Sequence, residues 1–297
     1  MSILSIQGLT KRYGKITAIE HLTLEVEKGM SFGILGPNGS GKTTTLGIVL
    51  GIIHSNAGEF QWFDGQYGQG HRRHIGALLE TPNFYPYLNA VENLEIIAHI
   101  KKIASPRITP LLEMVNLYQR RHSPFRTYSL GMKQRLAIAA AMVGDPEVLI
   151  FDEPTNGLDP QGIAEVRQTL KEIAGMGKTI IMASHILDEV EKVCSHVAII
   201  KNGKLLATGT VGAIISDDMV VEVGADDPAS LGELLRKHPL VRQVEEKNGH
   251  LLLYLREEVS ASTINRLAFE HGIALSHLRV VKKSLESEFL AITSRES

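Results

Sequence analysis

The spacing of hydrophobic and polar positions changes along the chain, and the change predicts two kinds of strand. Apolar and polar residues alternate over Ile3–Val26, which is typical of half-buried antiparallel strands. Runs that are mainly apolar occur at Met30–Leu35, Ile75–Leu79, Val148–Phe151 and Thr179–Met182, and such runs are typical of strands buried on both faces. The pattern predicts an α/β fold in which an antiparallel β subdomain accompanies a core of parallel strands.

Helical spacing of apolar residues separates these strands. Helices are expected at Thr43–Ile53, at Asn89–Ile103, at Pro110–Leu117 with Thr109 as N-cap, at Leu130–Val143 after Ser129, at Pro160–Ile173 after Asp159, and at Leu187–Cys194. The second and third of these lie in a segment of about 84–127, which is predicted to be a helical subdomain inserted between strands. Glycines through Gly70 predict a hairpin-like segment before it, and Lys11–Lys15 predicts a turn.

The last third of the chain predicts a second, smaller domain. After a linker at about Gly209–Asp218, the expected order is strand, helix, strand, strand, helix, strand, which is the ferredoxin-like α+β arrangement. The expected elements are strands Met219–Val223, Val241–Glu246, Leu251–Leu255 and Leu275–Val280, helices Pro228–Lys237 and Ser260–Glu270, and a final helix Leu285–Ile292. We therefore predict a larger domain at 1–215 and an accessory domain at 216–297.

Composition excludes several classes of function. The 297 residues include 31 basic and 33 acidic residues, a net charge of −2 that argues against a surface dedicated to nucleic acid. The single cysteine, Cys194, excludes an internal disulfide and a cysteine-based metal cluster. Neither a secretion signal nor a run of roughly 18 apolar residues is expected. His238, His250, His271 and His277 show no metal-ligand spacing and are expected to be ordinary surface or core residues.

The segment Gly36-Pro37-Asn38-Gly39-Ser40-Gly41-Lys42-Thr43 matches the pattern G-x-x-x-x-G-K-[ST] between an expected strand and an expected helix. Glycines let the backbone curl so that N–H groups point at phosphate oxygens, and the helix start adds further N–H groups and the positive end of its dipole. Lys42 is expected to reach the β and γ phosphates, and Thr43 to ligate magnesium. The segment predicts a bound nucleoside triphosphate.

Polar residues also follow other apolar strands. Asp152 and Glu153 follow one of them, and carboxylates at the buried end of a strand are costly unless they meet a metal, water or nucleotide. His185 follows another strand and is expected beside these partners. Ser129, as an N-cap, faces whatever lies beyond the start of its helix. Tyr13 is compatible with stacking on an adenine and equally with a place at the strand edge.

Taken in order, five motifs resemble those of the ATP-binding cassette (ABC) ATPases. They are the phosphate loop, Tyr128–Arg135 (YSLGMKQR), Val148–Pro154 (VLIFDEP), Gly157–Asp159 and Ala183–His185. The resemblance covers about residues 3–215, and YSLGMKQR is similar to the signature of cassette subunits of the bacitracin-export and lantibiotic-immunity type. It implies a P-loop nucleotide hydrolase core with an antiparallel β subdomain and a helical subdomain, and the C-terminal α+β extension is similar to the tail of such exporter ATPases.

The resemblance also implies roles for individual residues. The expected ATP-binding residues of one chain are Tyr13, which would stack on adenine, and Gly36, Pro37, Asn38, Gly39, Ser40, Gly41, Lys42, Thr43 and Thr44. The expected Mg²⁺ ligands are Thr43, Asp152 and Glu80, and the expected catalytic residues are Glu153, His185, Lys42 and Glu80. Glu153 would activate the attacking water, and His185 would bridge it to the γ phosphate.

A second copy of the chain completes the site that the resemblance implies. Ser129 and Gly131 would contact the γ phosphate held by the other copy, with Asp159 near the seam of a head-to-tail, two-fold homodimer.

Two positions depart from the usual family pattern. The signature is usually L-S-G-G-Q, and Leu130 and Met132 here replace a glycine and the glutamine. Glu80 stands where the family usually has a glutamine that contacts magnesium and water and senses the permease. A carboxylate there adds negative charge beside the metal, which favours Mg²⁺ affinity and opposes the approach of the γ phosphate.

The resemblance thus implies an ATP-hydrolysing subunit that dimerises on ATP and drives a separate transmembrane permease, in the direction of export. It would be cytoplasmic, peripheral on the inner face of the cell membrane, and without a nucleic acid partner. Two alternatives stay open: a non-transport cassette ATPase that acts as a mechanical module, and a regulatory module that holds ATP without turnover. The single cassette argues against the first, and Lys42, Asp152, Glu153 and His185 argue against the second.

Overall fold

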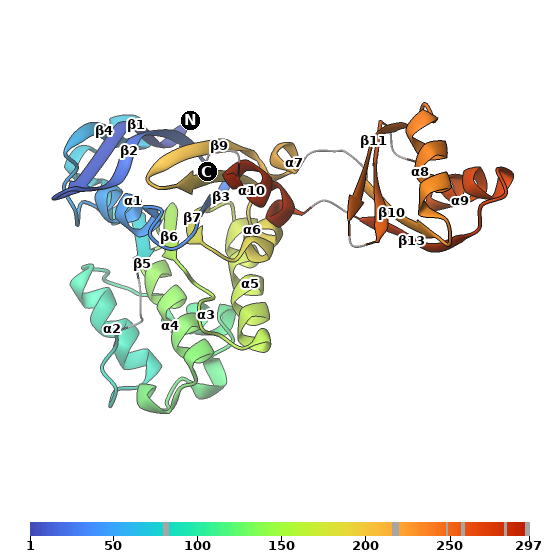
Figure 1. The fold of residues 1–297 in the computed structure, drawn as a ribbon. Coiled ribbons are helices and arrows are strands. Elements are labelled where there is room, and N and C mark those ends of the chain that lie inside the picture. Colours follow the sequence, from blue (N-terminus) through green and yellow to red (C-terminus); the bar gives the residue numbers. More distant parts are fainter. Residues whose placement is uncertain (80–82, 216–219, 248, 257–258, 282–283, 295–297) are drawn as a thin grey trace. The chain divides into compact units, whose positions relative to one another are not determined.

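The computed structural model describes residues 1–79, 83–215, 220–247, 249–256, 259–281 and 284–294 (Figure 1). The chain divides into two compact units, Met1–Val211 with the end of the chain from Ile292, and Gly212–Ala291. The short helix α7 (Val211–Ile214) lies at this division, where the sequence predicted a linker with one short helix. Within the described residues, every helix is too short or too polar to cross a membrane.

A six-stranded sheet forms the centre of the first unit, in the order β5-β6-β7-β3-β8-β9. Its strands are β3 (Ser31–Leu35), β5 (Ile75–Leu78), β6 (Val148–Asp152), β7 (Thr179–Ser184), β8 (His196–Lys201) and β9 (Lys204–Thr210). The strands run parallel except β9, which pairs antiparallel with β8. Every residue of β3, β6 and β7 is buried, which explains their unbroken apolar runs and confirms the predicted core.

Helices connect these strands and pack on the sheet (Figure 1). They are α1 (Lys42–Val49), α4 (Leu130–Met142), α5 (Pro160–Gly175) and α6 (Leu187–Val193). Helix α1 contacts β6 and β7, α4 contacts β5, and α6 contacts β3. The predicted N-caps of α4 and α5 are confirmed, because Ser129 Oγ accepts a hydrogen bond from Met132 N and Asp159 Oδ1 accepts one from Gly162 N.

A three-stranded antiparallel sheet of order β2-β1-β4 packs beside the central sheet (Figure 1). Its strands are β1 (Ser2–Tyr13), β2 (Ile16–Glu27) and β4 (Ala57–Trp62). The apolar positions of the alternating pattern, such as Ile6 and Leu22, join Ile34 of β3 in one hydrophobic core. The predicted β subdomain is confirmed, but the turn predicted at Lys11–Lys15 shrinks to two residues because β1 continues to Tyr13.

The hairpin-like segment predicted through Gly70 is wrong. The chain instead forms two short 3₁₀ helices, η1 (Phe63–Gly65) and η2 (Gly68–His74). Phe63 is fully buried, and the ring of Tyr67 stacks on that of His74 with centroids 3.7 Å apart. The packing of these aromatic rings therefore determines the conformation of the segment. The glycines alone had predicted a hairpin with cross-strand pairing.

The helical subdomain lies between β5 and β6 along the chain, as predicted, and sits on the other side of the central sheet from the antiparallel strands (Figure 1). Its elements are α2 (Ala90–Ile100), α3 (Ile108–Met114), η3 (Tyr118–Arg120) and η4 (Phe125–Thr127). Their apolar residues pack with Leu136 of α4 and with Val143, which follows that helix. The predicted N-cap Thr109 is wrong: α3 begins at Ile108, because Pro110 is tolerated anywhere in a first turn, where backbone N–H groups are unpaired.

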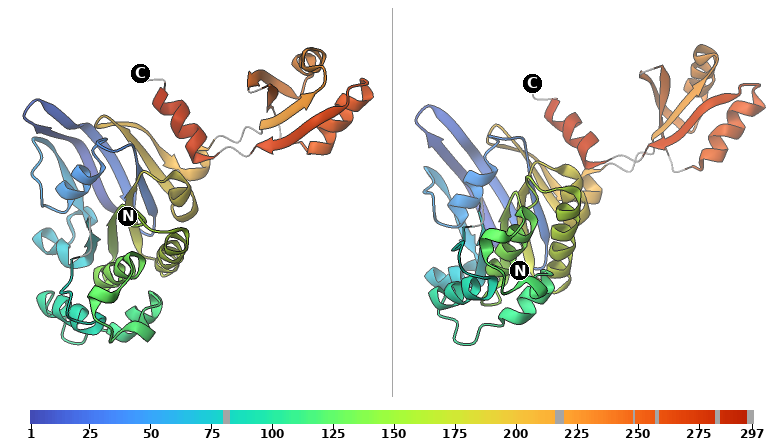
Figure 2. Two further views of the ribbon diagram at one scale, coloured as in Figure 1. Left: turned by 60° about the horizontal axis from the view of Figure 1, so that its bottom comes forward. Right: turned by 90° about the horizontal axis from the view of Figure 1, so that it is seen from below.

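The accessory unit contains the predicted β-α-β-β-α-β order, which confirms its ferredoxin-like class. Its elements are β10 (Val220–Ala225), α8 (Pro228–Lys237), β11 (Val241–Lys247), β12 (His250–Leu255), α9 (Ala261–Glu270) and β13 (Leu275–Val281). The antiparallel sheet has the order β11-β12-β10-β13, and both helices cover one of its faces (Figures 1 and 2). The final helix, α10 (Leu285–Ser294), returns the chain to the first unit, where Lys201 Nζ donates to the carbonyl of Thr293.

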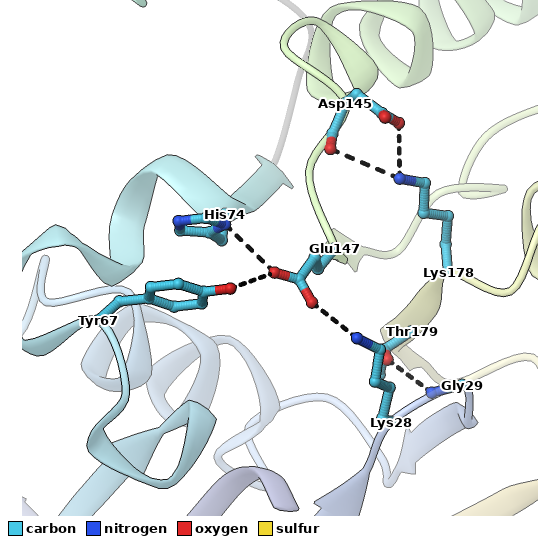
Figure 3. Close-up of polar contacts among 8 residues, drawn as sticks. All are labelled: Lys28, Gly29, Tyr67, His74, Asp145, Glu147, Lys178 and Thr179. Carbon is cyan, nitrogen blue, oxygen red and sulfur yellow. Dashed lines mark hydrogen bonds and ion pairs between the residues drawn. The ribbon is translucent and has the colours of Figure 1, made fainter. Parts of the chain in front are cut away.

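A carboxylate at the start of β6 holds three segments of the first unit together (Figure 3). Glu147 accepts hydrogen bonds from Lys28 Nζ at 3.0 Å and from Tyr67 Oη at 2.9 Å, and its Oε1 lies 3.3 Å from His74 Nδ1. The hydrogen bond from Lys28 is the largest cause of the lowered pKa of Glu147. The fold therefore favours the charged form of this carboxylate. Its contribution to stability is complete at a pH above the ordinary pKa range of a glutamate.

We predict that Glu147→Gln lowers the free energy of unfolding of the first unit by about 1 kcal/mol at neutral pH. Since the folded-state pKa is lowered, the charged form contributes its stability above the unfolded-state pKa and loses it as the pH falls through the folded-state value, so the difference from the unsubstituted protein shrinks in acid. Urea denaturation followed by the fluorescence of Trp62, the single tryptophan, measures it. Asp145→Asn is the matched control, because the carboxylate of Asp145 is 87% exposed in its ion pair with Lys178 and is expected to contribute little. Equal losses in the two variants, or a loss independent of pH, would contradict the assignment.

Candidate functional site

The phosphate loop lies where three parallel strands end at the same level. Leu35, the last residue of β3, pairs with Ser184 at the end of β7, and Ala183 pairs with Asp152 at the end of β6. Ligands bind at the carboxyl ends of strands in α/β sheets because the loops and helix starts there leave backbone N–H groups unpaired. The register therefore brings the phosphate loop together with the segments that follow Asp152 and Ser184.

Glycine is required at Gly41, where the loop enters α1. Its φ is +108°, a conformation that side chains oppose, and a Cβ atom there would lie 2.4 Å from the carbonyl oxygen of Ala18. A Cβ atom at Gly36 would lie 2.3 Å from the carbonyl oxygen of Ile200. The loop thus packs directly on the backbones of β2 and β8, which fixes its curvature.

The ammonium group of Lys42 is held over this loop. The side chain is 6% exposed, and Nζ donates to the carbonyl oxygens of Gly36 at 2.8 Å and Pro37 at 3.3 Å. Nζ also lies 3.4 Å from Glu153 Oε1. A buried charge needs such partners, and the same group is suited to meet phosphate oxygens that enter the loop.

Glu153 and His185 form a second pair beside Lys42. Glu153 Oε2 lies 2.8 Å from His185 Nδ1 and accepts a hydrogen bond from the backbone N–H of His185 at 3.3 Å. Since an ionised carboxylate only accepts, the tautomer that fits this contact carries its proton on Nδ1, which leaves Nε2 available to other groups. Glu153 has a φ of +48°, and a strained backbone in a non-glycine residue is typical of functional sites. Asp152, one residue earlier, is buried at the end of β6.

Sequence reasoning missed Ser184, which fixes the backbone before α6. Its Oγ accepts a hydrogen bond from the backbone N–H of Ile186 at 3.0 Å, across the residue that carries the imidazole. A serine favours such a turn because its hydroxyl can accept a hydrogen bond from the N–H two residues later. Ser184 within the segment Ala183–His185 was therefore the signal in the sequence.

The hydroxyl and carboxylate groups of the site fit a phosphate and a hard cation. Ser40 Oγ is buried and, within the described part of the chain, lacks a hydrogen-bond partner, which a phosphate oxygen could supply. Thr43 is exposed in the first turn of α1, and Asp152 is buried at the neighbouring strand end. Hydroxyl and carboxylate oxygens are the ligands that magnesium prefers. The residues present therefore fit a magnesium nucleotide.

Tyr13 ends β1 with 48% of its surface exposed. The ammonium group of Lys11 lies 4.9 Å from the centroid of its ring. No polar or ring contact between described residues links Tyr13 to the phosphate loop. The geometry is compatible with stacking on a base, and the role predicted for Tyr13 stays a prediction.

Gly131 lies beside the start of α5, the helix that Asp159 caps in the same chain. A Cβ atom at Gly131 would lie 3.5 Å from the Cα atom of Gly162 in the first turn of α5, the helix that Asp159 caps. Ser129 is exposed at the start of α4. The hydrogen bonds and ion pairs of the described residues do not connect this segment with the phosphate loop. The starts of α4 and α5 thus form one surface of their own.

An ion pair fixes the helix that carries this surface. Arg135 Nη2 lies 3.0 Å from Glu165 Oε2, and Arg135 Nη1 donates to the carbonyl oxygens of Val115 and Asn116. Burial is the largest cause of the lowered pKa of Arg135. The arginine joins α4 to α5 and to the end of α3. Glu80, the remaining predicted site residue, lies outside the described residues.

Comparisons with known proteins find a family and relatives that this chain resembles. Residues 19–156 match the family model described as ABC transporter. The chain is 36% identical over 308 residues to Nod factor export ATP-binding protein I of Ralstonia nicotianae, covering 99% of this chain and 94% of that protein. It is 35% identical over 297 residues to bacitracin transport ATP-binding protein BcrA of Bacillus licheniformis, covering 98% of this chain and 97% of that protein.

A similar fold occurs in a solved ATP-binding cassette, a dimer in a post-hydrolysis state bound to ADP and phosphate. That structure has a TM-score of 0.63 and 26% sequence identity, and it covers 71% of this chain and 99% of its own.

We predict that Gly41→Ala distorts the loop, because an added Cβ atom meets a backbone oxygen that is fixed in β2. The expected result is a loss of about 2–3 kcal/mol in the free energy of unfolding of the first unit and at least a tenfold weaker binding of a fluorescent ATP analogue. Gly14→Ala is the matched control, since Gly14 also has a positive φ but nothing lies within 4 Å of the added atom. Wild-type nucleotide affinity in Gly41→Ala would show that the loop does not need this geometry.

Proposed function

The chain belongs to the ABC transporter family as an ATP-binding, ATP-hydrolysing subunit, and from that premise we propose that two copies share their ATP sites and drive a separate membrane permease. The observation that carries the proposal is the chain of contacts from the phosphate loop through Lys42 and Glu153 to His185. It joins a phosphate-binding group to a carboxylate held for proton transfer.

The loop and the start of α1 bind the phosphates in this proposal. Backbone N–H groups of Gly39 and Gly41, and those of Lys42 to Thr44 at the helix start, would face the phosphate oxygens, while the N–H of Ser40 donates to the carbonyl oxygen of Pro37 within the loop. Lys42 exchanges its contacts with the loop carbonyls and Glu153 for contacts with the β and γ phosphates. This exchange leaves Glu153 free to engage the attacking water.

Thr43 and Asp152 are the proposed ligands of Mg²⁺, the threonine directly and the aspartate through water. The bound ion would neutralise negative charge on the β and γ phosphates. Glu80 is proposed as a third acidic group near this position, on the family pattern alone. Its carboxylate would strengthen binding of the cation and tie occupancy of the site to the permease.

Glu153 is the proposed base that orients and deprotonates the attacking water. Its Oε2 is held by His185, while Oε1 faces Lys42. Nδ1 of His185 donates to Glu153, so Nε2 is the nitrogen that can contact the γ phosphate. It can donate a hydrogen bond there when both ring nitrogens carry a proton. The histidine thereby positions carboxylate and phosphate relative to each other.

We predict that Glu153→Gln lowers the rate of ATP hydrolysis at least a hundredfold while ATP affinity changes less than threefold, because the amide keeps the shape but loses the basic oxygen. Phosphate release and equilibrium binding of ATP measure the two effects. The matched control is Glu172→Gln, an exposed carboxylate on α5. Substantial hydrolysis in Glu153→Gln would exclude this residue as the base.

The surface formed by Ser129, Gly131 and Asp159 is proposed to complete the site of a second copy. Ser129 is exposed at the N-terminus of the 13-residue helix α4, where N–H groups favour an anion. The dimeric cassette of similar fold supports this arrangement. Tyr13, at the exposed end of β1, is the proposed adenine-stacking residue of the chain that supplies the phosphate loop.

We predict that two inactive variants restore hydrolysis when mixed. Lys42→Ala damages the phosphate loop, and Ser129→Asp keeps the helix cap but sets a negative charge against the γ phosphate. Each variant alone is expected to hydrolyse ATP below a tenth of the wild-type rate. Random pairing makes half of the dimers mixed, and each mixed dimer has one intact site, so the mixture recovers about a quarter of the wild-type rate.

Ser129→Thr, which keeps both the hydroxyl and the cap, is the control for this experiment and retains hydrolysis. Absence of recovery in the mixture would contradict shared sites, because a site contained in one chain cannot be repaired by another chain. The variants are refolded or exchanged together so that mixed dimers form before the rate is measured.

Export through a membrane permease is the proposed use of this hydrolysis. The relatives named for bacitracin transport and Nod factor export support it. Tyr85 and Tyr87 are 50% and 68% exposed just after the Glu80 segment, with ring centroids 6.0 Å apart. Exposed aromatic side chains of this kind are typical of protein interfaces. We propose that a cytoplasmic helix of the permease docks there and holds this subunit on the inner face of the membrane.

A further inference from the structure

Three metal-ligand side chains lie together on the accessory sheet, on the face that its helices leave open. Val221 and Val223 of β10 face the helices, in the core with Leu231 and Ile264, so Glu222 and Gly224 face the other way. Gly224 pairs with His277 of β13, and Val223 pairs with Leu251 of β12, which sets His250 opposite Gly224. The register places His250 on one side of Gly224 and His277 on the other. Glu222 lies two residues before Gly224 on β10.

The three side chains point at a common space. The rings of His250 and His277 stack with centroids 4.5 Å apart, and His277 Nε2 lies 3.5 Å from Glu222 Oε2. One nitrogen of each ring and a carboxylate oxygen all lie within 4.8 Å of one another. Nδ1 of His250 and Nε2 of His277 are buried, and neither has a hydrogen-bond partner within the described part of the chain. Buried ring nitrogens without such partners are costly, and a metal ion satisfies both.

Gly224 makes the arrangement possible. A Cβ atom there would lie 2.7 Å from His250 Nδ1 and 3.2 Å from the Cβ atom of His277. Any side chain at this position would push the rings apart. The glycine therefore allows the two imidazoles to approach each other across the middle strand.

Two other histidines of the same unit show the ordinary alternative. Nδ1 of His238 accepts a hydrogen bond from Leu240 N, and Nδ1 of His271 lies 2.9 Å from the carbonyl oxygen of Leu267. These local bonds give Nδ1 of each ring a hydrogen-bond partner, as in ordinary surface or core histidines. His250 and His277 depart from that expectation, because ligands drawn from separate strands leave no short spacing in the sequence.

We propose that Glu222, His250 and His277 bind a divalent transition-metal cation, with Zn²⁺ as the best fit. Two imidazoles and one carboxylate are a zinc ligand set, and a water molecule or a further group would occupy the fourth position. A tetrahedral zinc ion sets its ligand atoms about 3.3 Å apart, so modest side-chain rotations close the cluster. Arg279 pairs with Glu222 across the sheet, is exposed, and forms no ion pair with that carboxylate among the described contacts.

The site ties together three neighbouring strands of the accessory sheet, β12, β10 and β13. A ligand that binds only the folded state raises its stability, so Zn²⁺ raises the thermal midpoint of this unit. The proposal is independent of the ATP site, since all three residues belong to the unit Gly212–Ala291.

Calorimetric titration of the tag-free full chain with Zn²⁺, without nucleotide, tests the proposal. We expect one Zn²⁺ per chain at micromolar or tighter affinity, and at least a tenfold weaker affinity in His250→Gln, His277→Gln and Glu222→Gln. His238→Gln and His271→Gln are the matched controls and keep the wild-type affinity. Equal binding by the cluster variants and the unsubstituted chain, or binding only at millimolar Zn²⁺, would overturn the proposal.

A measurement on the unsubstituted protein guards against variants that fail to fold. Zn²⁺ is expected to shift the imidazole NMR signals of His250 and His277 and to leave those of His238 and His271 in place. Shifts confined to the other histidines, or no shifts at saturating Zn²⁺, would equally overturn it.

Discussion

The buried ammonium group of Lys42 is the interaction on which the nucleotide site depends. A charge with so little exposure is tolerated only beside oxygen atoms that replace water, and here these are two loop carbonyls and Glu153. The loop can supply its carbonyls because Gly41 lets it curl against the backbone of β2. Glu153 can face Lys42 because it follows β6 in a strained conformation. Its carboxylate is held by a hydrogen bond to His185, which follows β7. Phosphate oxygens that attract Lys42 therefore act on the proposed base as well.

The sequence predicted the parts of the fold that are set by burial on both faces of a strand and by side-chain caps. The apolar runs located β3, β6 and β7, and Ser129 and Asp159 marked the starts of α4 and α5. Prediction failed where tertiary packing decides. Buried Phe63 and the Tyr67–His74 stack turned an expected hairpin into 3₁₀ helices, and Pro110 did not fix the start of α3. The chain segments joined by Glu147 are far apart in the sequence, so no local pattern could show that network.

The candidate site was likewise predictable as a set of motifs and unpredictable as geometry. Motif order predicted Lys42, Asp152, Glu153 and His185 as site residues, but only the register of β3, β7 and β6 shows that the strands before them end at the same level. The cluster on the accessory sheet is the opposite case. Its proposed ligands come from three strands whose pairing is known only from the fold. The spacing of His250 and His277 along the chain therefore gave no sign of a metal site. The two units thus differ in kind: one is organised around phosphate, and the other offers imidazole and carboxylate to a cation.

An ATP site shared between two chains can be tested by cross-linking two differently labelled chains. Burial raises the pKa of the thiol of Cys194, the single native cysteine, so introduced cysteines are the reactive ones. One chain carries Asn38→Cys, the other carries Ser129→Cys, and both carry Glu153→Gln to retain ATP. We expect a short bifunctional maleimide to join the two different chains with ATP and not with ADP. Failure to form this product with ATP, or its equal formation without nucleotide, would contradict a site completed by the second copy.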